Sequence, residues 1–152
     1  MDYEIVTLQE KTVAGISART NNGDPQMSVV IGGLWRSFFE EGIYQSIPDK
    51  TDGKALGIYM DYAGNEKDDY TIMVASETKA KEQNDQITVR KIPAGRYAKF
   101  IVRGDMHQAV AAAWKEIWSM DLPRTFVCDF EEYQDDKMED AEIHIYIGLK
   151  AE

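Results

Sequence analysis

Apolar and polar residues alternate along most of this chain, in segments that favour β-strands. Near the N-terminus, "YEIVTLQEKTVAGISAR" alternates well enough to predict one long strand, clearest from Val13 to Arg19. "ALGIYMDY" and "DYTIMVASET" predict two more strands, and "ITVRKIPAGRYAKFIVRG", "TFVCDFEEY" and "EIHIYIGLK" predict the remainder. The strand that begins at Ile87 is expected to bend at Pro93-Ala94-Gly95, because proline cannot donate a ladder hydrogen bond.

Two other segments place apolar residues at helical spacing. The first runs from Met27 to about Gly42, where a glycine suits a helix end. The second follows Asp105, which can cap it, and stops before Leu122-Pro123. The apolar stripes are Ile31, Leu34, Trp35 and Phe38 in the first helix, and Val110, Ala113, Trp114 and Ile117 in the second.

The order strand, helix, strand, strand therefore occurs twice, in pseudo-repeats of about 1–79 and 86–150. Residues 34–39 match 113–118 by residue class, and 59–62 match 130–133, which makes Met60 the counterpart of Glu131. We predict one domain over 1–152 with an α+β fold. Its duplicated βαββ units form a shared antiparallel sheet, with both helices on one face and a ligand groove between the halves.

Charge and composition narrow the function classes. The 152 residues include 17 Lys and Arg against 27 Asp and Glu, a net charge of -10, which disfavours direct binding of nucleic acids. The chain shows no secretion signal and no run near the roughly 20 apolar residues of a membrane span, so we expect a cytoplasmic protein. Cys128 is the only cysteine, which excludes an intramolecular disulfide.

Glu131 is the carboxylate of greatest interest. It shares a strand face with Tyr133, whereas Glu132 points to the opposite face. On one interpretation Glu131 lies in solvent near a strand end. On the other it lies at the floor of an aromatic cleft, where an unpaired and partly desolvated carboxylate is a receptor for a cation.

Aromatic side chains could supply the walls of such a cleft, although for any one of them the sequence alone favours packing in the core. Trp35 and Trp114 are the most interesting pair, because each lies at the edge of its helix stripe and they correspond in the duplication. The sequence alone leaves both alternatives open. The other candidates on predicted helices and strands include Phe39, Tyr59, Tyr133 and Tyr146.

Other chemistry finds little support. His107 and His144 are far apart and Cys128 has no second thiol, so no metal site is predicted. "GISAR" has Arg19 where a nucleophile elbow requires glycine, and no phosphate loop or dinucleotide fingerprint is present. We therefore assign no cofactor and no catalytic residue.

Four segments together resemble a known family. "IGGLWRSF", "GIYMDYAGNEKDDYTIMVAS", "IPAGRYAKFIVRG" and "AAAWKEIWSMDLPRTFVCDFEEY" are similar, in order and spacing, to GyrI-like small-molecule-binding domains. These are also the effector-binding domains of bacterial multidrug-sensing transcription regulators. The resemblance implies two βαββ units around a groove, in which a carboxylate meets cationic, lipophilic ligands among aromatic rings. Its motif spacing assigns that role to Glu131.

The chain has no basic helix-turn-helix ahead of this domain, so it resembles the standalone members that integron cassettes carry. A transcriptional effect would then need a protein partner that supplies DNA binding. The expected ligand is a cationic amphipathic small molecule, bound for drug sensing or sequestration. The expected ligand contacts are Glu131, Trp35, Tyr59, Trp114, Tyr146, Tyr133 and Phe39.

Two alternatives come from the same resemblance. One is a hydrolase of strained electrophilic compounds that uses Glu131 as general base for water, although the sequence shows no clear second acid or oxyanion arrangement. The other is an acidic protein-interaction module such as an inhibitor of DNA gyrase. We favour binding over catalysis.

Overall fold

The computed structural model describes residues 2–65, 67–80, 86–135 and 137–151, and it confirms the predicted α+β fold. Its helices are α1 (Met27–Glu40), α2 (Ile43–Ser46) and α3 (Met106–Ser119). The strands are β1 (Glu4–Leu8), β2 (Lys11–Thr20), β3 (Lys50–Met60), β4 (Tyr70–Thr78), β5 (Thr88–Ile92), β6 (Gly95–Gly104), β7 (Arg124–Tyr133) and β8 (Ala141–Leu149). The junction 81–85 between the predicted pseudo-repeats lies outside the described residues.

All the strands join one antiparallel sheet in the order β1-β6-β8-β7-β3-β4-β2-β5. The single long N-terminal strand predicted from the sequence is therefore wrong. It divides into β1, which pairs with β6, and β2, which pairs with β4 and β5. Each half of the chain thus places its first strand at the edge of the other half, and β3 and β7 meet at the centre.

The register is the same on both sides of the central pair, in which Gly57 lies opposite Glu131. Gly57 pairs next with Val74, the middle residue of β4, and Glu131 pairs with Ile145, the middle residue of β8. The prediction that Met60 is the counterpart of Glu131 is therefore wrong, and Gly57 takes that place. A match by residue class cannot fix a register that long-range hydrogen bonds set.

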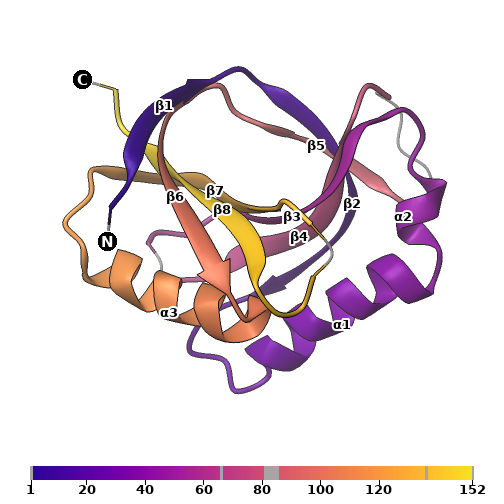
Figure 1. Cartoon of the computed structure of the whole chain (residues 1–152), viewed down its shortest axis with the longest axis horizontal. Coiled ribbons are helices and arrows are strands. Elements are labelled where there is room, and N and C mark those ends of the chain that lie inside the picture. Colours follow the sequence, from indigo (N-terminus) through magenta and orange to yellow (C-terminus); the bar gives the residue numbers. More distant parts are fainter. Residues whose placement is uncertain (1, 66, 81–85, 136, 152) are drawn as a thin grey trace.

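Both long helices lie on the same side of the curved sheet, α1 against the first half and α3 against the second (Figure 1). Buried side chains form one cluster under each helix and a third that strands alone enclose, on the other face of the sheet. This arrangement confirms the predicted placement of the helices. In the described part of the chain, no helix is long and apolar enough to cross a membrane.

The ends of the helices follow the sequence signals closely. Asp105 caps α3, and its carboxylate accepts hydrogen bonds from the backbone N–H groups of His107 and Gln108 at 3.1 and 3.0 Å. Gly42 adopts the left-handed conformation just after α1, with φ 77°. Gln26 at the start of α1 makes no capping hydrogen bond through its side chain.

Replacing the α3 cap gives a direct test of this local account. Asp105→Ala should lower the free energy of unfolding by about 1 kcal/mol, because two backbone donors lose their acceptor. Urea unfolding followed by circular dichroism measures the change. Gln26→Ala is the matched control at the other helix and should have little effect; equal losses in both variants would contradict the assignment.

Candidate functional site

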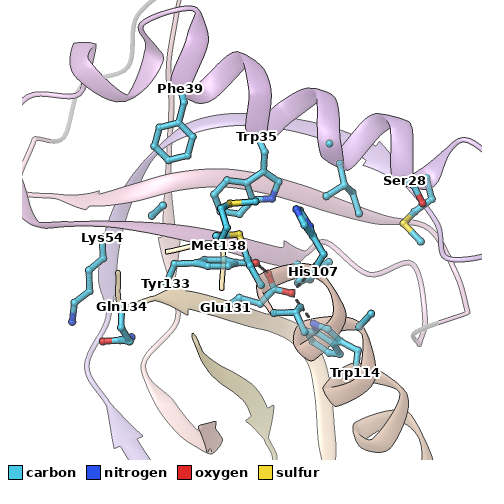
Figure 2. Close-up of a pocket in the computed structure, with 18 of the residues that line it drawn as sticks. Ser28, Trp35, Phe39, Lys54, His107, Trp114, Glu131, Tyr133, Gln134 and Met138 are labelled. Atoms are coloured by element: carbon cyan, nitrogen blue, oxygen red, sulfur yellow. Dashed lines mark hydrogen bonds between the residues drawn. The ribbon is translucent and has the colours of Figure 1, made fainter. Parts of the chain in front are cut away.

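A groove of about 1180 Å³ lies between α1, α3 and the centre of the sheet (Figure 2). Trp35 and Phe39 reach it from α1, and Trp114 reaches it from α3. Tyr59 of β3 and Tyr133 of β7 line its floor beside Glu131. Aromatic rings therefore reach the groove from both helices and from its floor, which suits an apolar ligand body.

Glu131 is only 2% exposed, and its two carboxylate oxygens accept hydrogen bonds from three side chains. The Trp114 indole N–H donates to Oε2 at 2.7 Å, and the Tyr59 hydroxyl donates to the same oxygen at 3.0 Å. The Tyr133 hydroxyl donates to Oε1 at 2.8 Å. Trp114 is on a helix and Tyr59 on the neighbouring strand, so the tertiary fold assembles this set.

All three of these donors are neutral groups. Burial, and then the neighbouring Glu131, raises the pKa of both Tyr59 and Tyr133 well above the ordinary range, which keeps their hydroxyls protonated. Burial also raises the pKa of Glu131, and the three hydrogen bonds only partly oppose that effect. Among the described residues, no lysine, arginine or histidine forms an ion pair with this carboxylate.

Asp129 is a second buried carboxylate on the same strand, and its partners differ from those of Glu131. It is fully buried, and Arg124 donates to its Oδ2 at 2.7 Å in an ion pair. Tyr62 donates to the same oxygen at 2.6 Å, and the backbone N–H of Gly148 donates to Oδ1 at 2.8 Å. Asp129 thus has a cation of its own, whereas Glu131 has none among the residues that the structure describes.

Gly57 leaves the space that the Glu131 side chain occupies. A Cβ atom at Gly57 would lie 2.9 Å from Oε1 of Glu131 and 3.3 Å from the ring of Trp35. Either contact is too close for a packed side chain, so alanine there would push one of these groups aside. A glycine inside a strand is a recognised sign of such close approach, and this is the signal in the sequence that could have identified Gly57.

The structure places six of the seven predicted contacts at the groove: Glu131, Trp35, Tyr59, Trp114, Tyr133 and Phe39. Tyr146 lies elsewhere. It pairs across the sheet with Phe130, stacks on that ring at 4.6 Å and belongs to the cluster that strands alone enclose. Because Phe130 and Glu131 are adjacent, their side chains point to opposite faces of the sheet. Tyr146 is paired with Phe130 and therefore points to the same face as Phe130, away from the groove.

Several groove residues were not among the predicted contacts. Tyr62 and Tyr70 line one part of the groove, and His107 of α3 also lines it (Figure 2). Three methionines, Met27, Met106 and Met138, add flexible apolar surface. Helical spacing from Trp35 and Trp114 could have identified Met27 and Met106, but nothing local indicates Met138.

The residues that the structure describes contain no cluster of three or more His, Cys, Asp or Glu side chains that could hold a metal ion. His107 lies at the groove, whereas His144 lies beside Glu142, with Nε2 2.7 Å from its carboxylate. The two histidines therefore belong to different parts of the molecule.

A family model decides the relationship of the chain. The model of Cass2, the integron-associated effector binding protein, matches residues 4–149. The chain belongs to the Cass2 family. The resemblance to GyrI-like domains, and to their standalone integron members, is thereby confirmed, and this Cass2 chain is a small-molecule effector-binding domain.

Individual relatives agree with that assignment. A Bacillus subtilis protein named as a candidate transcriptional regulator, YobU, is 29% identical over an alignment of 160 positions that covers 96% of each chain. The Vibrio cholerae integron cassette protein has the same fold, with a TM-score of 0.80 at 24% identity over 97% of this chain and 95% of that one. SAV2435, solved bound to tetraphenylphosphonium, has a TM-score of 0.82 at 20% identity over 99% and 95%.

The raised pKa of Glu131 predicts a particular pH dependence of stability. From its ordinary value of 4.5 upward, the folded chain holds this proton more tightly than the unfolded chain does. Glu131 therefore lowers the free energy of unfolding as the pH rises from 4.5 through the higher folded pKa, and the loss is complete above it.

Glu131→Gln, which mimics the protonated form, isolates this contribution from other carboxylates. Thermal unfolding of wild type and variant from about pH 4 to about pH 8 should show the variant gaining relative stability as the pH rises. The gain should then become constant. A stability difference that does not change with pH would contradict the buried, unpaired carboxylate.

Proposed function

We propose that this Cass2 protein binds cationic, lipophilic compounds in the aromatic groove, with Glu131 as the counter-charge. The observation that carries the proposal is the Glu131 carboxylate, which is 2% exposed and whose hydrogen-bond donors in the described part of the chain are all neutral. A buried charge without a partner is unfavourable, so a cation that enters the groove gains the interaction that the protein itself does not supply.

The groove walls suit the rest of such a ligand. The faces of Trp35, Trp114 and the two floor tyrosines attract positive charge and cover apolar groups. Neutral analogues would bury the carboxylate without compensating it, so selectivity follows from desolvation. The tetraphenylphosphonium bound to SAV2435 has the charge and the apolar bulk that this groove favours.

Related proteins provide the basis for proposing how the bound compound is used. YobU carries the name of a regulator, and a related fold occurs in the EcmrR protein solved in complex with DNA. We propose that the protein senses or sequesters cationic drugs. A transcriptional response would pass through a separate protein that supplies DNA binding, because the acidic chain itself repels phosphates.

Isothermal titration calorimetry with tetraphenylphosphonium tests the counter-charge. Wild type should bind it, and Glu131→Gln should lower the affinity by at least about tenfold, because the buried charge pair is lost. Triphenylphosphine oxide, a neutral compound with similar rings, should bind weakly to both proteins.

Glu132→Gln is the matched control. Glu132 follows Glu131 directly and has the same side chain, but it is opposite Leu56, receives a hydrogen bond from Gln134 and does not line the groove. This variant removes one negative charge and should retain wild-type affinity. Equal losses of affinity in the two variants would mean that only the net charge of the protein matters. Unchanged affinity in Glu131→Gln would refute the assignment.

A further inference from the structure

The two helical walls of the groove are built on the same pattern. Helices α1 and α3 each have fourteen residues, and six positions that line the groove recur in both. Lys115 of α3 also lines the groove, whereas its counterpart Arg36 of α1 does not. The corresponding pairs are Met27 and Met106, Ser28 and His107, Ile31 and Val110, Gly32 and Ala111, Trp35 and Trp114, and Phe39 and Trp118.

The ring contacts repeat as well. Trp35 of the first half meets Tyr133 of the second edge to face, with centroids 5.0 Å apart and planes at 74°. Trp114 of the second half meets Tyr59 of the first in the same way, at 5.2 Å and 66°. Because each tryptophan contacts the tyrosine of the other half, the two contacts are related by the exchange of the halves.

The outer rings continue this relation. Phe39 lies 6.2 Å from Trp35 between ring centroids, and Trp118 lies 6.3 Å from Trp114. Phe39 is 46% exposed and Trp118 is 41% exposed, although both line the groove. Each wing of the groove therefore ends in an aromatic ring that a ligand can still cover.

Glu131 lies at the centre of this arrangement. Its backbone lies opposite Gly57 in the middle of the sheet. On their other sides, Gly57 and Glu131 each pair with the middle residue of the neighbouring strand. The corresponding tyrosines, Tyr59 and Tyr133, donate to its two different oxygens. Since Gly57 has no side chain, one carboxylate serves both halves.

We infer that the groove takes a cation that carries two apolar arms of similar size, with the charge over Glu131 and one arm along each helix. This inference rests on the proposed function and specifies the ligand class. A ligand with one long arm would cover one wing and leave the ring at the other end in water.

The relation between the walls does not extend to the whole lining. Tyr44, Lys54 and Gln134 line one part of the groove, and Tyr62 and Tyr70 line another, without counterparts of the same kind. The arms need therefore be similar in size rather than identical. The paired helix residues determine the length of each ligand arm, and the lining residues without counterparts determine which chemical groups each arm can carry.

Two isomeric cations test how the apolar groups must be distributed. Dibenzyldimethylammonium carries two one-ring arms, and (biphenyl-4-ylmethyl)trimethylammonium carries the same atoms and charge with both rings in one arm. Calorimetry on wild type should show the two-armed isomer binding about tenfold more tightly, a difference of about 1.4 kcal/mol. Equal affinities, or tighter binding of the one-armed isomer, would overturn the inference while the proposed function stands.

Variants at the two ends supply an independent readout. Phe39→Ala and Trp118→Ala should each weaken the two-armed isomer several-fold and by similar factors, whereas the one-armed isomer should respond to only one of them. Val29→Ala, an exposed α1 position outside the lining, is the matched control. Sensitivity of the two-armed isomer to one end alone would overturn the inference, and failure of both isomers to bind wild type would refute the proposed function itself.

Discussion

The burial of the Glu131 carboxylate without a cation is the constraint on which the rest of the structure depends. Desolvation of an ion is unfavourable by several kcal/mol, and three hydrogen bonds from neutral donors offset only part of it. The protein must therefore hold Trp114, Tyr59 and Tyr133 in place with stability from elsewhere. On the proposed function, the ligand supplies the positive charge that the site lacks.

The packing that supports the site lies on the opposite face of the sheet. Phe130 lies on the face of β7 opposite Glu131 and stacks on Tyr146, in the cluster that strands alone enclose. The strand that carries Glu131 is therefore packed on the face away from the groove. Asp129, one residue before Phe130, has its own ion pair with Arg124. The fully paired carboxylate of Asp129 therefore belongs to the scaffold, whereas the carboxylate of Glu131 lines the groove.

The exchange of edge strands joins the two halves of the chain beneath the groove. β1 pairs with β6 and β5 pairs with β2, so each half of the chain completes the sheet of the other. With β3 and β7 joined at the centre, α1 and α3 rest on one continuous sheet. The spacing of their tryptophans therefore depends on the sheet that both helices share.

The sequence by itself determined what depends on near neighbours. Alternation and helical spacing indicated the types of most elements, and Asp105 marked the start of α3. The two-residue spacing of Glu131 and Tyr133 placed them on one face of their strand. Tertiary structure alone decided the division of the N-terminal strand, the place of Gly57 opposite Glu131 and the face on which Tyr146 lies. These features depend on the register between strands, which long-range backbone hydrogen bonds fix and which a shift of one residue would invert. The donors that converge on Glu131 come from a helix and two strands, so their meeting had no signature in any one segment.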